Sequence, residues 1–145
     1  MVFYKRLPTY NPQKTNGHPR KVSTAEHKRN SAKTTNYGEH GLISYDSTER
    51  YPTSVWKFAT DKQKEALHPT QKPIELCRYA IRTYTNPGDV VLDNCCGAGS
   101  IPVSAMSEGR KYIGMDNGVC ERQGELYGVP WATIATDRIE RYSKY

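Results

Sequence analysis

The segment from residue 90 to residue 116 most constrains the fold, because its pattern requires a strand, a loop, a helix and a second strand. The run Val90-Val91-Leu92 is short, apolar and partly β-branched, which predicts a buried strand. A loop of small residues follows at 95–100, a helix is expected over 101–109, and a second strand over 111–115. Strands joined through a helix in this way are parallel, and the crossover is right-handed in nearly all proteins. The chain is therefore predicted to contain the start of a parallel α/β sheet.

Helices are expected on both sides of this segment. A proline suited to a first helical turn precedes apolar residues at helical spacing, which predicts an amphipathic helix over 73–84. A final helix is expected over 131–142. Residues 7–66 show no sustained period, and prolines and glycines interrupt them repeatedly. Two short runs have strand-like composition. Val2-Phe3-Tyr4 precedes this region, and Val55-Trp56-Lys57-Phe58 lies within it.

Length and charge divide the chain into two predicted segments. At 145 residues it has the size of one ordinary domain, and only 36% of its residues are hydrophobic, so part of it is expected to be loop or to be ordered by a partner. Residues 1–66 hold 12 Lys and Arg against six Asp and Glu, whereas residues 67–145 hold nine of each. We predict a basic, loop-rich segment over 1–66 that contacts a polyanion, and an α/β segment over 67–145. A solvated basic loop without a partner is the alternative interpretation.

Two acids and two glycines in the α/β segment are spaced as in a site for a nucleotide-like ligand. Asp93 and Asp116 end the two predicted strands, and ligands of parallel sheets bind beyond the carboxyl ends of the strands. Gly97 and Gly99 let the chain turn sharply and let a ligand approach the backbone. Asp116 is placed to accept hydrogen bonds from ribose hydroxyls.

The acid at Asp93 favours S-adenosylmethionine over a dinucleotide as the ligand. A carboxylate repels pyrophosphate but attracts an amine-bearing or cationic ligand, and S-adenosylmethionine carries a sulfonium and an α-amino group. Pro102 stands where the dinucleotide fingerprint has its third glycine, and no phosphate-binding Gly-x-x-x-x-Gly-Lys run occurs. An NAD- or nucleotide-binding domain is therefore the weaker interpretation. A further alternative is that the loop is only a tight strand–helix connection whose small residues serve packing.

The run His68-Pro69-Thr70-Gln71-Lys72-Pro73 forms a rigid entry into the first predicted helix. The N–H groups of the first helical turn and the Thr70 hydroxyl can hold the carboxylate of an amino-acid ligand. An ordinary helix N-terminus without a ligand is the alternative.

In combination, three runs resemble successive motifs of the beta-class DNA amino-methyltransferases of bacteria and phages. They are His-Pro-Thr-Gln-Lys-Pro at 68–73, Val-Leu-Asp-Asn-Cys-Cys-Gly-Ala-Gly-Ser at 91–100 and Tyr-Ile-Gly-Met-Asp at 112–116. Placing the helix-entry motif before the glycine loop is typical of the beta class, and the resemblance covers nearly the whole chain. It implies a partial Rossmann-like fold of the S-adenosylmethionine-dependent methyltransferases. It also implies methylation of the exocyclic amino group of adenine (N6) or cytosine (N4) in DNA, within a restriction–modification system or alone.

The resemblance assigns roles to individual residues. Thr70 would hold the methionine end of the cofactor and Asp116 its ribose. The pocket around the methionine end would be lined by Asp93 and by the backbone of Asn94, Cys95, Gly97 and Gly99. Many family members have Pro-Phe after the strand's Asp, whereas Asn94-Cys95 stands here. The usual aromatic wall is therefore missing, which puts the affinity for the cofactor in doubt.

The resemblance also implies double-stranded DNA as the partner of residues 1–66, since this region contributes to target recognition in the family. Phosphate contacts position a protein on DNA without reading its sequence. Six basic residues are predicted to make such contacts: Lys14, Arg20, Lys21, Lys28, Arg29 and Lys33.

The catalytic motif of this family is an Asp, Asn or Ser followed by Pro-Pro and an aromatic residue, and it binds the amino group of the flipped target base. No Pro-Pro pair occurs in the 145 residues, so no catalytic residue is predicted in this chain. We expect the cofactor-binding C-terminal part of a split or truncated enzyme, working with a separate N-terminal methyltransferase half. The alternative is a non-enzymatic DNA-binding remnant with a vestigial cofactor pocket.

The remaining composition predicts neither a metal site nor a membrane segment. The four cysteines (Cys77, Cys95, Cys96 and Cys120) form no C-x-x-C pair, so reduced thiols in a reducing compartment are expected. No apolar run is long enough to span a membrane, and the first residues lack the apolar core of a signal peptide. A cytoplasmic protein without membrane partners is predicted.

Overall fold

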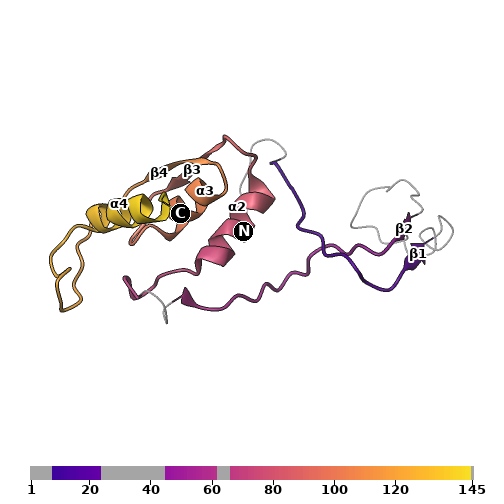
Figure 1. The fold of residues 1–145 in the computed structure, drawn as a ribbon, viewed down its shortest axis with the longest axis horizontal. Coiled ribbons are helices and arrows are strands. Elements are labelled where there is room, and N and C mark those ends of the chain that lie inside the picture. Colours follow the sequence, from indigo (N-terminus) through magenta and orange to yellow (C-terminus); the bar gives the residue numbers. More distant parts are fainter. Residues whose placement is uncertain (1–7, 24–44, 62–65, 145) are drawn as a thin grey trace, which may run out of the picture. The chain divides into compact units, whose positions relative to one another are not determined.

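The computed structural model describes residues 8–23, 45–61 and 66–144. They form two compact units (Figure 1). The larger unit comprises the described residues up to Asn11 and from Val55 onward, and the smaller unit comprises those from Pro12 to Ser54. Each unit is described by itself.

The sheet of the larger unit has two parallel strands, β3 (Val90–Asp93) and β4 (Lys111–Gly114). In their register Val90 lies opposite Lys111, and Leu92 lies opposite Ile113. Both strands and their parallel pairing agree with the prediction from sequence. The strand–helix–strand order with parallel strands agrees with the expected partial Rossmann-like fold.

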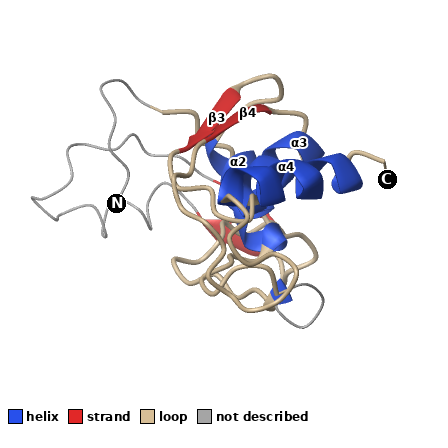
Figure 2. Ribbon diagram, turned by 90° about the vertical axis from the view of Figure 1, so that its left-hand side faces the viewer, coloured by secondary structure: helices blue, strands red, loops and turns tan. Residues whose placement is uncertain are grey.

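Three helices of the larger unit pack together on one side of this sheet (Figure 2). They are α2 (Ile74–Tyr84), α3 (Ser100–Ser107) and α4 (Trp131–Tyr142). The central helix α3 contacts both other helices and both strands. Its Val103 is fully buried and packs with Ile74 of α2 and Ile139 of α4. The predicted helices at 73–84, 101–109 and 131–142 are thus confirmed to within two residues at each end.

The other face of the sheet is largely apolar and exposed to solvent. Paired residues of parallel strands share a face, so Val90 and Leu92 lie on the same face as Lys111, Ile113 and, by alternation, Met115. Lys111 is exposed, and the four apolar residues have exposed fractions of 57%, 60%, 52% and 48% in chain order. The prediction of a buried strand at 90–92 is therefore wrong in the described structure. The apolar composition is that of a strand covered on both faces, and one face here is bare.

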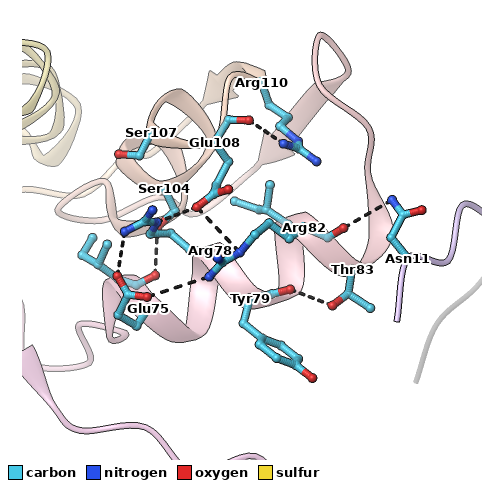
Figure 3. Close-up of polar contacts among 12 residues, drawn as sticks. Asn11, Glu75, Arg78, Tyr79, Arg82, Thr83, Ser104, Ser107, Glu108 and Arg110 are labelled. Carbon is cyan, nitrogen blue, oxygen red and sulfur yellow. Dashed lines mark hydrogen bonds and ion pairs between the residues drawn. The ribbon is translucent and has the colours of Figure 1, made fainter. Parts of the chain in front are cut away.

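Ion pairs fasten the end of α3 to α2 (Figure 3). Glu108, whose side chain is only 11% exposed, accepts a hydrogen bond from Arg78 Nε at 2.6 Å, and Arg82 Nε lies 3.7 Å away. Arg78 also pairs with Glu75 at 2.8 Å. Arg110 donates to the carbonyl of Glu108 and to that of Thr85 just after α2. These ion pairs and hydrogen bonds therefore hold α2, which precedes β3, against α3, which follows the glycine loop.

The smaller unit has a short antiparallel pair that the sequence did not reveal, β1 (Lys21–Ser23) and β2 (Tyr45–Ser47). Three-residue strands are too short to produce a detectable alternation. The strand-like run at 55–58 is not a strand in the larger unit; Trp56 and Phe58 instead place their rings 4.6 and 5.6 Å from that of Tyr79. The predicted strand at Val2-Phe3-Tyr4 lies outside the described residues.

We expect the isolated chain to self-associate through the bare sheet face. Replacing Leu92 and Ile113 together by threonine should lower this association, because it removes exposed apolar surface while keeping good strand formers. Sedimentation velocity would measure the association, and urea unfolding should show little loss of stability. The control is Val103→Thr, which buries a hydroxyl and should cost about 1–3 kcal/mol. A wild-type chain that stays monomeric up to high concentration would contradict the expectation.

Candidate functional site

A cavity of about 400 Å³ opens at the carboxyl ends of β3 and β4. Its walls come from the helix-entry segment, the strand ends and the glycine loop. The residues that line it are His68, Thr70, Gln71, Lys72, Asp93, Cys95, Cys96, Gly97, Ala98, Ser100, Ile101 and Asp116. Five of the seven predicted cofactor residues are therefore brought together. The other two, Asn94 and Gly99, are not among the lining residues.

The parallel pairing brings the two acids to one edge of the sheet. Asp93 lies opposite Gly114, and the ladder continues beyond the strands with Cys96 N–H donating to the Met115 carbonyl at 2.9 Å. Asp93 and Asp116 consequently both line the cavity and are both half-buried. Two carboxylates at one mouth give the site an excess of hydrogen-bond acceptors, suited to a ligand with amine and hydroxyl donors.

Asp116 has a structural role as well as an accessible surface. Its Oδ2 accepts the N–H of Gly97 at 2.9 Å, and its Oδ1 accepts the N–H of Gly118 at 2.9 Å. Each carboxylate oxygen has two lone pairs, so these two bonds leave capacity for further donors. The carboxylate thus holds the glycine loop against the end of β4 and can still accept from a ligand.

The two glycines of the loop are needed for different reasons. Both have a left-handed backbone, with φ of 48° at Gly97 and 76° at Gly99. A Cβ atom at Gly97 would lie 3.3 Å from the ring of His68, on the cavity side. A Cβ atom at Gly99 would lie 2.9 Å from Cβ of Ala135 on α4. Gly97 therefore shapes the cavity, whereas Gly99 permits close packing of the loop on a helix.

The helix-entry segment is held by its own histidine. Nδ1 of His68 accepts the N–H of Thr70 at 3.1 Å and lies 3.1 Å from the Thr70 hydroxyl oxygen. The N–H of Ile74 donates to Asp61 Oδ2 at 2.6 Å, so one donor of the first turn of α2 is already engaged. No local sequence pattern predicts the role of Asp61, because its partner lies 13 residues along the chain. Thr70 lines the cavity and is exposed.

A second cavity of about 540 Å³ adjoins the first, since His68 and Asp116 line both. Its other walls include Val119 and Trp131, and the rings of His68 and Trp131 lie 4.3 Å apart at their centroids. Sequence reasoning missed His68 and Trp131 as cavity residues. The position of His68 within the helix-entry motif could have suggested the first of them.

The cysteines differ in their access to the cavity. Cys95 is exposed at the cavity wall, whereas Cys77, Cys96 and Cys120 are buried. Burial raises the pKa of Cys77 to about 11 and also raises that of Cys96. The stabilising contribution of the protonated Cys77 is complete below the ordinary thiol pKa of 9.0 and is lost as the pH rises toward 11. Within the described ranges no cluster of His, Cys, Asp and Glu is placed to hold a metal ion.

The described part of the chain contains no helix that is both long and apolar enough to cross a membrane.

Two of the predicted DNA-binding residues in the smaller unit are paired with acids. Lys14 Nζ lies 3.0 Å from Glu49, and this hydrogen bond raises the lysine pKa. Arg20 binds Asp46 through two nitrogens, which raises the arginine pKa and lowers that of the acid. Lys14 and Lys21 line a cavity of about 330 Å³. The other three predicted contacts, Lys28, Arg29 and Lys33, lie outside the described residues.

The parallel strands, the glycine loop between them and the acids at their ends make a Rossmann-like α/β unit with a ligand-sized cavity at the strand ends. The family model for DNA methylases matches residues 1–120, which is most of the chain. The chain therefore belongs to the DNA methylase family, the N6 and N4 amino-methyltransferases, whose cofactor is S-adenosylmethionine.

Individual relatives match shorter segments. The chain is 37% identical over 71 residues to the DNA adenine methyltransferase YhdJ of Escherichia coli K12, covering 47% of this chain and 24% of that protein. It is 33% identical over 92 residues to the type II methyltransferase M2.DpnII of Streptococcus pneumoniae, covering 61% of this chain and 34% of the relative. The chain thus spans about a quarter to a third of the length of these relatives.

Among solved structures, the complex of M1.HpyAVI with SAM is similar to this chain. The two are 29% identical with a TM-score of 0.41, covering 52% of this chain and 32% of the other.

We expect Cys95 to be the one fast-reacting thiol of the native chain, because the other three cysteines are buried. Under limiting iodoacetamide, mass spectrometry should find the label on Cys95, and S-adenosylmethionine should slow the labelling because Cys95 lines the cavity. Adenosine monophosphate at the same concentration serves as the control ligand. Equal labelling rates with and without S-adenosylmethionine would argue against this cavity as the cofactor site.

Proposed function

We propose that this chain forms the S-adenosylmethionine-binding part of an enzyme that methylates an exocyclic amino group of adenine or cytosine in cytoplasmic DNA. The observation that carries the proposal is the cavity at the strand ends, where Asp93, Asp116 and Thr70 meet a glycine loop. Its volume of about 400 Å³ is within the range of small-molecule sites, about 300–1,000 Å³. Membership of the DNA methylase family supports the same cofactor.

The residues of the cavity fit this cofactor in charge and in hydrogen-bonding capacity. When bound, S-adenosylmethionine supplies an electrophilic methyl group on its sulfonium. Asp93 would accept from the α-amino group, and Asp116 would accept from the ribose hydroxyls with the lone pairs left by Gly97 and Gly118. Thr70 would orient the carboxylate end from the helix-entry segment, provided that its hydroxyl turns its hydrogen away from His68.

The groups that bind the target base would come from a separate polypeptide segment. The family's Pro-Pro motif does not occur in these 145 residues, and the largely apolar face of the sheet is exposed in the described structure. Parallel sheets are normally covered on both faces, so further elements of a methyltransferase domain fit on the face around Leu92 and Ile113. We propose that those elements carry the catalytic motif.

The basic segment over 1–66 would contact the DNA backbone, with Lys14, Arg20 and Lys21 as the described candidates. Exposed ion pairs contribute little to stability. Phosphate oxygens of DNA can therefore replace Glu49 and Asp46 as partners of Lys14 and Arg20. The acids would then act as internal competitors that limit non-specific affinity.

Calorimetry of the purified chain with S-adenosylmethionine tests the cofactor site. Asp93→Asn should weaken binding about 10- to 100-fold, because a hydrogen bond to a charged group is worth about 1.5–3 kcal/mol. The matched control is Asp137→Asn on the exposed side of α4, which should bind like the wild type. No binding by a wild-type sample that is folded by circular dichroism would overturn the proposed site and favour a DNA-binding remnant.

The smaller unit gives a second test through fluorescence anisotropy with a labelled DNA duplex. Glu49→Gln should tighten binding several-fold, because it removes a competing anion beside Lys14. Lys14→Gln should weaken binding and reduce the slope of log affinity against log salt by about one. If both variants bind like the wild type, Lys14 does not contact the DNA.

A further inference from the structure

Helix α4 contributes to the candidate cofactor site although the family match ends at residue 120, before the helix begins. Two of its residues, Ala135 and Arg138, are one turn apart and lie on one face of the helix. Both are buried, with 4% and 1% of their surface exposed. Both contact the glycine loop between β3 and α3.

The guanidinium of Arg138 donates hydrogen bonds to the end of the glycine loop and to the first residue of α3. Its Nη1 lies 3.0 Å from the Ala98 carbonyl oxygen and 3.3 Å from the Ser100 hydroxyl oxygen. A guanidinium stays charged in proteins, so burying it is costly unless hydrogen bonds fix it. The hydrogen bonds that stabilise the buried guanidinium therefore also fix the positions of Ala98 in the loop and of Ser100 at the start of α3. Tyr142, one turn further along α4, places its ring 5.9 Å from the guanidinium carbon.

Ala135 prevents the loop from moving toward the helix. The Cβ position of Gly99 lies 2.9 Å from Ala135 Cβ and 3.2 Å from Ala135 Cα, so the backbone rests on the helix surface. The loop is then held from three directions, by Ala135, by Arg138 and by the Asp116 carboxylate on Gly97 N–H.

We propose that Arg138 is a positioning residue for the cofactor, acting through Ala98 and Ser100, which line the cavity. This inference rests on the proposed function. It predicts that Arg138 affects the methionine end of S-adenosylmethionine, which the loop meets, more than the adenosine end. The ligand pair S-adenosylmethionine and methylthioadenosine separates the two ends, because the second lacks the amino-acid portion.

The test compares Arg138→Met, Arg138→Lys and the matched control Arg141→Met in the full chain. Arg141 is on the same helix and exposed, so its replacement makes the same change in charge at the helix surface. Hydrogen exchange followed by mass spectrometry reports the loop without any ligand. In Arg138→Met the amides of residues 97–100 should exchange about tenfold faster than in the wild type, with α2 and β4 unchanged.

Calorimetry supplies the second readout. Arg138→Met should bind S-adenosylmethionine about tenfold more weakly, with a change of less than about twofold for methylthioadenosine. Arg138→Lys, which keeps the charge but reaches fewer acceptors, should lie between the wild type and Arg138→Met and carries the test if the methionine variant does not fold. Arg141→Met should match the wild type.

The outcomes separate this inference from the proposed function. If the wild type binds S-adenosylmethionine and the Arg138 variants bind and exchange like it, Arg138 is not a positioning residue, and the cofactor site stands. Equal weakening of both ligands would indicate a general structural role and would also overturn the inference. If the folded wild type binds neither ligand, the proposed function and this inference both fail.

Discussion

The hydrogen bond between Gly97 N–H and the Asp116 carboxylate joins the two halves of the strand–helix–strand unit at the point where its chemistry is concentrated. It acts together with the bond from Cys96 N–H to the Met115 carbonyl, and Gly99 of the same loop packs on Ala135. The parallel register of β3 and β4 makes the contact possible, because it brings the end of one strand beside the end of the other. The cavity and the position of Asp93 follow from that geometry.

The same sheet explains why this unit is expected to need a partner. Helices α2, α3 and α4 cover one face and supply the core around Val103. The face around Leu92 and Ile113 stays largely exposed to solvent in the described part of the chain. A two-stranded sheet with one bare apolar face is marginal in water. The candidate cofactor site and the surface for association therefore lie on the same two strands. The strand ends line the cavity, and the exposed strand face is where further elements can pack.

The sequence predicted the helices and the parallel strands of the larger unit well, but it predicted what surrounds them poorly. Helix α4 was predicted at its observed bounds. Pro130 precedes its first residue, and its buried residues recur at helical spacing. The burial of the strand at 90–92 could not be predicted, because burial depends on what covers a strand and not on its composition alone. The contacts of Asp61 and Arg138 were not predicted for a similar reason. Each joins segments 13 or more residues apart, and no local sequence pattern predicts such a pairing.

The proposed double use of Asp116 would couple folding to cofactor binding. The carboxylate spends one lone pair of each oxygen on the backbone of Gly97 and Gly118, and the proposed ribose contact would use the remaining ones. A ligand that binds the folded chain alone stabilises it in proportion to the logarithm of its concentration over its dissociation constant. Since the ligand and the loop share one anion, loss of that anion would weaken the loop and the binding together. Stability and affinity at this position therefore cannot be changed independently, whereas at Asp93, whose side chain accepts only the neighbouring Cys95 N–H among the bonds described, they can be.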